Sequence, residues 1–191
     1  FSAQQNQLLI ARSGGKAQVW SLQPPTPLPI MAFGLGGKPL VLEEGEDVLC
    51  MAANGKGTII SGLRNGLPVR KDLDVGGGIT SAILPPGGKE VIAGTVDGRL
   101  VACETGLGVR EIGKVPTLIA KVAVSPDGGL LVAGGDDGFL GAWDWPSGNP
   151  RKVGWSHKDS ISDLAFISPS GMLASVSRDQ VLLIGLIGSG H

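Results

Sequence analysis

The chain has no tyrosine, two cysteines and two histidines among its 191 residues. One histidine is the terminal His191, and Cys50 and Cys103 lie far apart, so no zinc-ligand spacing is present. Lys and Arg number 16 against 17 Asp and Glu, and this balance gives no general attraction to nucleic acid or to an anionic membrane. No apolar run approaches the ~18 residues of a membrane-spanning helix. These absences argue against a metal site, a nucleic-acid-binding domain and a membrane segment in this chain.

Two cysteines are too few for a disulfide-stabilised scaffold. Both lie within apolar segments, so we expect two buried thiols in a reducing compartment inside the cell, with the cytoplasmic face of its membranes favoured. Ser156, His157 and Asp159 are too close in sequence to face one another as a catalytic triad. We therefore expect neither enzymatic activity nor a cofactor.

What the sequence does contain is a repeat. An apolar strand, a tight polar turn and a second apolar strand recur five times, at intervals of 41, 42, 40 and 41 residues. This period is typical of β-propeller blades. The sequence predicts an all-β propeller of four-stranded antiparallel blades, with about 17 or 18 strands and essentially no helix. The units open at Leu9, Cys50, Ile92, Val132 and Leu173.

The fourth unit shows the pattern of strands most clearly. Strands are predicted at 119–124, 130–134 and 139–143, separated by a Ser-Pro-Asp-Gly turn and by Asp137-Gly138. Arg151 to Val153 can add a short outer strand. The strands are nearly continuous in apolar residues, which suits sheets covered on both faces.

The predicted domain is a single propeller or a segment of one. The first unit lacks an inner strand and continues after Leu22 as a proline-rich connection, and the last lacks an outer strand. Either the five units close into a small ring, or the chain is part of a larger propeller. We expect the second, because an open arc leaves apolar faces uncovered. The units lie near residues 6–33, 38–73, 79–112, 119–153 and 161–187.

The last two units resemble the WD-repeat family. Trp143-Asp144 stands where the namesake dipeptide of that family falls, after Asp137. That family links a loop histidine, a strand serine or threonine, a turn aspartate and a strand tryptophan by hydrogen bonds. The resemblance implies three of these four roles in the fifth unit, with Ile184 at the fourth position. Those three residues are His157, Ser175 and Asp179.

A narrower similarity concerns residues 121–179. This stretch, with Trp145-Pro146-Ser147 and Ser156-His157, is similar to propellers that act as exchange factors for the small GTPase of COPII coats. The similarity implies a guanine nucleotide exchange factor as the alternative function.

Our first hypothesis is a non-catalytic scaffold that presents loops to other proteins in a larger complex. Tryptophan and arginine most often anchor interfaces. The alternative is that Trp145 packs under the Pro146 turn and that Trp155 fills a gap between sheets. The candidate partner-binding residues are Trp145, Trp155, Arg151, Lys158 and Arg178.

Overall fold

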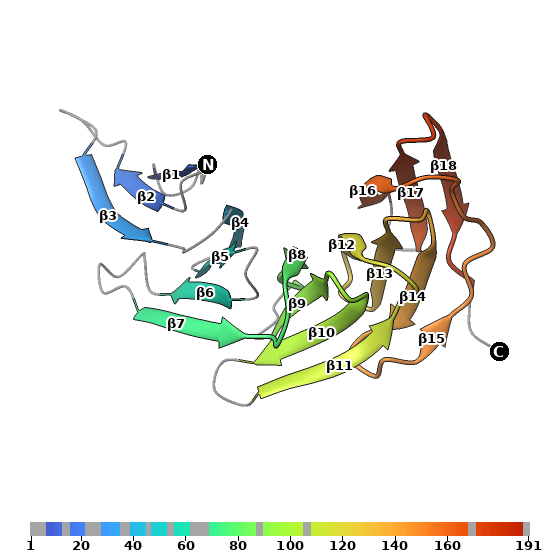
Figure 1. Cartoon of the computed structure of the whole chain (residues 1–191), viewed down its shortest axis with the longest axis horizontal. Helices are drawn as coiled ribbons and strands as arrows, with labels where there is room; N and C mark the ends of the chain where they lie inside the picture. Colours follow the sequence, from blue (N-terminus) through green and yellow to red (C-terminus); the bar gives the residue numbers. More distant parts are fainter. Residues whose placement is uncertain are drawn as a thin grey trace. The chain divides into compact units, whose positions relative to one another are not determined.

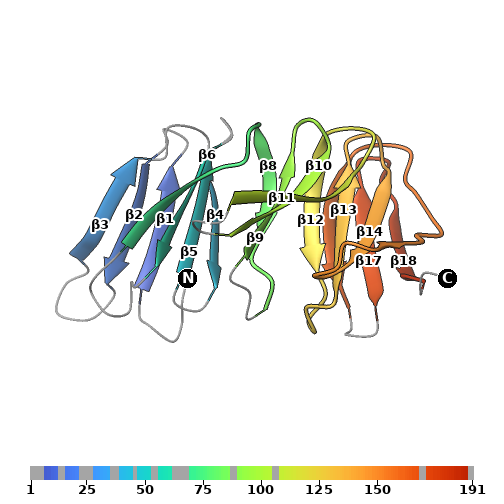
Figure 2. The same ribbon diagram turned by 90° about the horizontal axis from the view of Figure 1, so that it is seen from below.

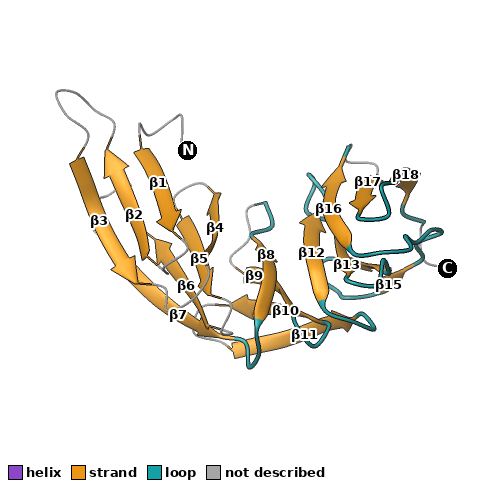
Figure 3. Ribbon diagram, turned by 45° about the horizontal axis from the view of Figure 1, so that its top comes forward, coloured by secondary structure: helices purple, strands orange, loops and turns teal. Residues whose placement is uncertain are grey.

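The computed structural model consists of strands joined by turns and loops, and its described part contains 18 strands and no helix (Figures 1 and 3). The structure describes residues 7–12, 16–21, 28–34, 39–44, 47–52, 56–61, 69–86, 90–104, 108–167 and 171–188, and side-chain packing within residues 74–188. Two compact units are present, Phe1–Gly78 and Ile79–His191. The predicted all-β fold with four-stranded antiparallel sheets is confirmed.

The first compact unit, Phe1–Gly78, holds two antiparallel sheets, ordered β1-β2-β3 and β4-β5-β6-β7. The first sheet comprises β1 (Gln7–Arg12), β2 (Lys16–Ser21) and β3 (Leu28–Gly34). The second comprises β4 (Pro39–Glu44), β5 (Asp47–Ala52), β6 (Lys56–Ser61) and β7 (Val69–Asp74).

The strand β3 was not predicted from the sequence, where its residues belong to a proline-rich connection. Proline donates no backbone hydrogen bond, so it argues against a central strand. In the structure, Pro29 lies opposite Trp20 in a strand at the edge of its sheet, beside a register shift. An edge strand tolerates proline, because only one side of it needs partners.

The second compact unit, Ile79–His191, holds three antiparallel sheets, whose strands lie side by side in Figure 2. One contains β8 (Ile79–Ile83), β9 (Glu90–Thr95), β10 (Arg99–Glu104) and β11 (Gly108–Lys114). The next contains β12 (Ile119–Val124), β13 (Leu130–Gly135), β14 (Leu140–Asp144) and β15 (Pro150–Arg151). The last contains β16 (Ile161–Phe166), β17 (Met172–Ser177) and β18 (Leu182–Leu186).

Two apolar clusters bind these three sheets into one unit. The first joins the β8–β11 sheet to the β12–β15 sheet and includes Ile92, Leu131 and Trp143. The second joins the β12–β15 sheet to the β16–β18 sheet and includes Val132 and Leu173. In β9 and β13 every residue after the first is buried, as expected for strands covered on both faces.

Hydrogen bonds also join the inner strands β8 and β12, which lie side by side. The Thr80 hydroxyl donates to the Ile119 carbonyl, and Ser81 Oγ accepts from the Val122 N–H at 3.1 Å. Between the β12–β15 sheet and the β16–β18 sheet, Lys121 Nζ lies 3.6 Å from Asp163 Oδ1. The sheets of the second unit are therefore held together by polar contacts as well as by apolar packing.

Candidate interaction surface

A ladder of backbone hydrogen bonds runs along one end of the three sheets in the second unit. It starts at the turn between β9 and β10, where the Gly98 carbonyl accepts from the Val115 N–H at 2.9 Å. Val115 begins the loop that leads into β12. At the end of this loop the Leu118 carbonyl accepts from the Asp136 N–H at 2.9 Å, in the turn between β13 and β14.

The same two bonds recur at the next boundary. The His157 N–H donates to the Gly138 carbonyl at 2.9 Å, and the Arg178 N–H donates to the Ser160 carbonyl at 3.0 Å. Turns and loops therefore form one continuous ribbon. We call this ribbon the turn edge, and it comprises residues 95–99, 115–118, 135–139, 157–160 and 177–181.

Each Asp-Gly turn of this edge requires its glycine for two reasons. Gly98 has a φ of 81° and Gly138 a φ of 86°, a region that favours glycine. A Cβ at Gly98 would collide with the Val115 carbonyl, and one at Gly138 with the His157 carbonyl. The hairpin signal in the sequence thus also marks the place where the next loop approaches the turn.

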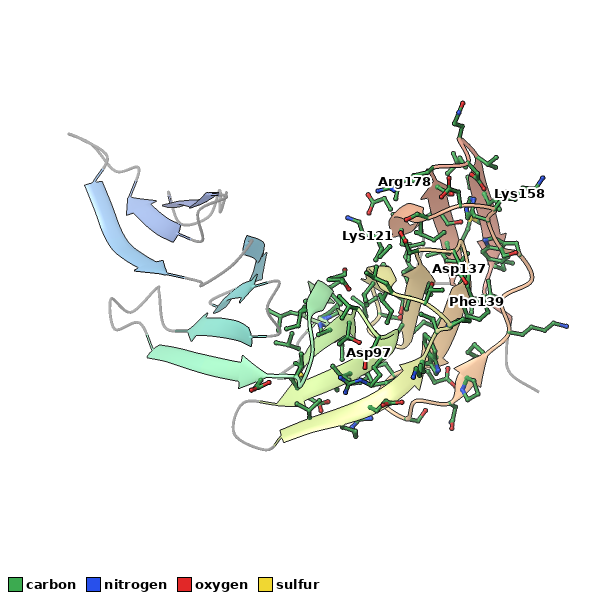
Figure 4. The ribbon with its side chains drawn as sticks, in the orientation of Figure 1. Asp97, Lys121, Asp137, Phe139, Lys158 and Arg178 are labelled. Carbon is green, nitrogen blue, oxygen red and sulfur yellow. The ribbon has the colours of Figure 1, made fainter. Side chains whose placement is uncertain are left out.

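The turn edge carries both apolar and charged exposed side chains, among them Phe139, Asp137 and Lys158 (Figure 4). Val96 is 50% exposed, Phe139 41% and Val181 43%. Asp97 is held by the Thr95 hydroxyl and by Arg99 Nε at 2.7 Å, and these hydrogen bonds, that of Thr95 first, lower its pKa. The exposed charged residues of the edge are Asp97, Asp136, Asp137, Lys158, Asp159 and Arg178.

The three sequence-predicted network residues of the fifth repeat meet at this edge. His157 Nδ1 lies 3.0 Å from Oδ2 of Asp179, and Nε2 lies 2.9 Å from Oγ of Ser175. A neutral imidazole with its proton on Nδ1 satisfies both contacts, if the Ser175 hydroxyl donates to Nε2. The His157 side chain is fully buried and Asp179 is nearly so, which fixes the loop against the turn.

Asp179 is the acceptor at the centre of this network. It accepts hydrogen bonds from the N–H groups of Lys158 at 2.9 Å and Val181 at 3.0 Å. The Lys158 N–H, followed by Val181 and His157, lowers the pKa of Asp179 from 3.8 to about 2. The carboxylate therefore stays ionised well below neutral pH.

The expected fourth position of the network is shifted by one residue. Trp143 pairs with Leu131 in the β12–β15 sheet, and in the β16–β18 sheet the residue that pairs with Leu173 is Gly185. Gly185, not Ile184, is therefore the counterpart of Trp143. The strand β18 is apolar along its whole length, so no alternation of polar and apolar residues fixes its register from the sequence.

Trp155 supplies the indole that Gly185 lacks. Its Nε1 donates to Oγ of Ser175 at 3.4 Å, and a Cβ at Gly185 would lie 2.6 Å from its ring. This position agrees with the alternative that Trp155 fills a gap between sheets. The network thus has four members, with its tryptophan contributed by the loop before His157.

The boundary between the β8–β11 and β12–β15 sheets also pairs one tryptophan with one glycine, but with the two positions exchanged. Val115 and His157 make equivalent hydrogen bonds, so Gly113 is the counterpart of Trp155. A Cβ at Gly113 would collide with the ring of Trp143. The first boundary therefore combines a glycine near the end of β11 with a tryptophan of β14, and the second combines a loop tryptophan with a glycine of β18.

The β12–β15 sheet has no corresponding polar network. The counterparts of His157 and Ser175 there are Val115 and Ala133, both buried. Asp137 Oδ1 instead accepts from the Phe139 N–H at 3.0 Å. The resemblance in this sheet consists of the turn and the tryptophan alone.

The candidate partner-binding residues fall into two groups. Lys158 and Arg178 are exposed on the turn edge (Figure 4). Trp145, Trp155 and Arg151 are partly buried within the chain. The apolar part of the edge was not predicted from the sequence, although Val96 and Phe139 each flank an Asp-Gly turn. A hydrophobic residue in that position is a usable signal for an exposed side chain.

Trp145 and Arg151 make specific contacts with their neighbours. The guanidinium of Arg110 lies 5.2 Å from the centre of the Trp145 ring, within cation–π range. Arg151 Nε lies 2.6 Å from Asp144 Oδ1. These contacts join β11 to the turn after β14, and β15 to β14.

The described residues offer little support for a metal site, a reactive thiol or a membrane-spanning helix. They include no group of three or more His, Cys, Asp or Glu side chains that could hold a metal ion. Burial raises the pKa of the free Cys103 thiol to about 11, so it is a poor nucleophile. No helix long and apolar enough to cross a membrane occurs within the described ranges.

Comparison with known proteins agrees with this geometry. Residues 115–144 match the family "WD domain, G-beta repeat". The chain is 28% identical to cilia- and flagella-associated protein 52 of Sus scrofa over 97 residues, which are 49% of this chain and 16% of that protein. The chain thus spans about a sixth of that relative.

A solved structure shows the same fold. The computationally designed Ika4 protein superimposes with a TM-score of 0.68 at 19% sequence identity, over 81% of this chain and 94% of that one. The family match begins at the loop into β12 and ends at Trp143-Asp144, the dipeptide singled out in the sequence. The chain therefore contains a WD40 repeat at residues 115–144, within an all-β fold of propeller type.

Proposed function

We propose that this protein is a non-catalytic docking scaffold that presents the turn edge to other proteins of a multiprotein assembly. The observation that carries the proposal is the hydrogen-bond ladder, which repeats from Gly98 to Arg178 across three sheets. The WD40 repeat supports the same function, since the repeat is typical of interaction proteins.

The ladder matters because binding costs less when the contacting loops are already ordered. Both loops of the edge are bonded at each end to a turn, and the second is fixed further by His157. Exposed Val96, Phe139 and Val181 supply apolar contact area. The first two turns carry exposed carboxylates only, at Asp97, Asp136 and Asp137, whereas the last loop and turn carry both signs, with Lys158 and Arg178 beside Asp159. A partner of complementary, divided charge fits this edge best.

Photo-crosslinking tests the proposal. A photoreactive amino acid replaces Phe139 on the turn edge or, as the matched control, Val109 on β11, which is similarly exposed at 43%. In an extract of the source cells, we expect a protein adduct from position 139 that is absent from position 109. Equal adducts from both positions, or none from position 139, would contradict the proposal.

Charge reversal adds a second measurement. Lys158→Glu with Arg178→Glu should remove the adduct formed at position 139, while Lys152→Glu should preserve it. Lys152 is exposed and lies on the same loop, before the buried His157. Circular dichroism of each variant establishes that the fold is intact. An adduct that survives the double reversal would place the docking surface elsewhere.

A further inference from the structure

The turn between β13 and β14 differs from the two neighbouring turns of the turn edge at its first residue. This residue is Thr95 in the turn between β9 and β10, and Ser177 in the turn between β17 and β18. Both side-chain hydroxyls donate hydrogen bonds. The residue at the same ladder position before the β13–β14 turn is Gly135. This turn therefore receives no hydroxyl from its strand.

The aspartate of the same turn, Asp137, also has fewer hydrogen bonds than its counterparts. Asp97 accepts from two side chains, and Asp179 accepts from one side chain and two N–H groups. Within the described ranges, Asp137 accepts only from the Phe139 N–H, at 3.0 Å. The loop N–H that binds Asp179 has its counterpart at Pro116, and proline has no N–H. The Asp137 carboxylate thus keeps most of its capacity to accept hydrogen bonds.

The Thr117 hydroxyl lies beside this carboxylate. Its oxygen is buried and has no hydrogen-bond partner in the part of the chain that the structure describes. A Cβ placed on Gly135 would lie 2.6 Å from Asp137 Oδ1 and 3.0 Å from Thr117 Oγ1, and the Phe139 carbonyl oxygen follows at 3.6 Å. Three oxygens therefore surround the side of Gly135 on which the neighbouring turns carry a hydroxyl side chain. A buried hydroxyl without a partner is costly, so a donor that reaches it gains affinity.

Three oxygens around one small space suit a positively charged group with several donors. A primary ammonium is compact and carries three N–H donors, whereas a guanidinium is planar and wider. The surroundings are acidic, because Asp136 is exposed beside Asp137 and residues 115–118 carry no charge. Phe139, which is 41% exposed, can pack against methylene groups. The end of a lysine side chain combines all these properties.

We propose that Asp137, Thr117 and the Phe139 carbonyl bind a lysine side chain of the docking partner. This inference rests on the proposed function and adds the chemistry of the partner at one place on the turn edge. Asp137 is exposed and held by a single N–H, so its carboxylate turns outward as the ammonium enters. The ammonium then donates to this carboxylate and to the Thr117 hydroxyl beneath it. The Phe139 carbonyl, which already accepts from the Gly135 N–H at 2.8 Å, retains a second lone pair for the third donor.

Carbodiimide coupling in an extract of the source cells tests the contact. A water-soluble carbodiimide activates a carboxylate, and an amine in contact with it forms an amide while the carbodiimide leaves as a urea. Mass spectrometry should find Asp137 joined to a lysine of another protein. Asp136→Asn is the matched control, since Asp136 is the exposed neighbour, and it should preserve this product. Coupling at Asp136 in place of Asp137 would overturn the proposal.

Two variants separate the site from the fold. Thr117→Val keeps the shape of the side chain and removes a hydroxyl without a partner among the described residues, so the Tm should not fall. Gly135→Ser supplies the residue that Ser177 is in the β17–β18 turn, and the atom nearest to its new Cβ belongs to the Asp137 side chain, which can move. Each variant should lower the yield of the coupled product at least fivefold. An undiminished yield in either variant with an intact fold would contradict the site.

The photo-adduct at position 139 separates this inference from the docking function itself. If that adduct forms and no lysine couples to Asp137, the docking surface stands and the lysine site is wrong. If neither product forms, the docking function fails as well.

A small probe tests the preference for an ammonium. N-acetyl-lysine methylamide should shift the amide resonances of residues 117 and 137–139, and N-acetyl-arginine methylamide should shift them less. Equal shifts, or none, would overturn the proposed specificity.

Discussion

Moving an indole from residue 155 to residue 185 tests the central packing relationship of the second unit. Trp155 covers Gly185 at one sheet boundary, and Trp143 covers Gly113 at the preceding one. The variant Trp155→Gly with Gly185→Trp would copy the preceding boundary. Glycine is needed at position 155, because a Cβ at Gly113 would collide with Trp143.

The two single variants should each destabilise the fold. Truncating a core tryptophan costs about 3–5 kcal/mol. Trp155 is only partly buried, so about half of that applies, and the new glycine adds about 0.5–1 kcal/mol through the unfolded chain. We expect a loss of about 3 kcal/mol for Trp155→Gly. Gly185→Trp forces two indoles into one space, since a Cβ there would already lie 2.6 Å from the Trp155 ring. Overpacking of this kind costs about 1–3 kcal/mol.

The double variant should recover most of this loss. If the two effects were independent, it would lose about 4–6 kcal/mol. If a single indole fills the space from either side, it should lose about 1.5 kcal/mol or less. Urea denaturation followed by circular dichroism gives the four free energies of unfolding. Trp145→Gly with Gly185→Trp is the control, because Trp145 packs elsewhere and should not rescue. If the double variant at positions 155 and 185 loses the sum of the two single losses, the idea that one indole can fill this space from either position is refuted.

Two further substitutions test the turn edge. The pKa of Asp179 is lowered from 3.8 to about 2, so the contribution of this carboxylate to stability is present above pH ~4 and is lost as the pH falls toward 2. In Asp179→Asn, the fall of Tm with decreasing pH should therefore be shallower than in the wild type. An unchanged slope would contradict the network. Gly138→Ala should lower the free energy of unfolding by about 2 kcal/mol or more, because the residue has a φ of 86° and its new Cβ would meet the His157 carbonyl. Gly129→Ala is the control and should cost much less, since the atom nearest to its new Cβ would lie 3.5 Å away. Equal losses would show that the close approach of the loop to Gly138 does not matter.

The fold could be predicted because its signals are local. Asp137-Gly138 and the Ser-Pro-Asp-Gly turn require particular backbone angles, and related turns rich in Gly, Pro and Asp recur between apolar runs at about one period. The strand β3 was not predictable in this way. Pro29 gives the same local signal in a connection as in an edge strand, and its place at the edge depends on the whole sheet.

The candidate surface could be predicted only in part. His157, Ser175 and Asp179 are polar residues in an otherwise apolar repeat, so they stand out, and the structure brings all three together. Whether Lys158 and Arg178 bind a partner stays a prediction, as does the cellular compartment. The exchange-factor alternative also stays a prediction, because neither the WD40 match nor the ciliary relative supports it.

The pairing of Trp155 with Gly185 was beyond the reach of the repeat pattern, for a physical reason. A packed boundary requires that the space be filled once, and it does not specify which side supplies the atoms. Trp143 fills it from a strand and Trp155 fills it from a loop, while Gly113 and Gly185 leave room for them. A consensus that assigns tryptophan to the strand therefore shows a gap at Gly185 where the molecule has none. Residues that face each other across a boundary must be compared in pairs, and the pair, more than the single position, is what these two boundaries have in common.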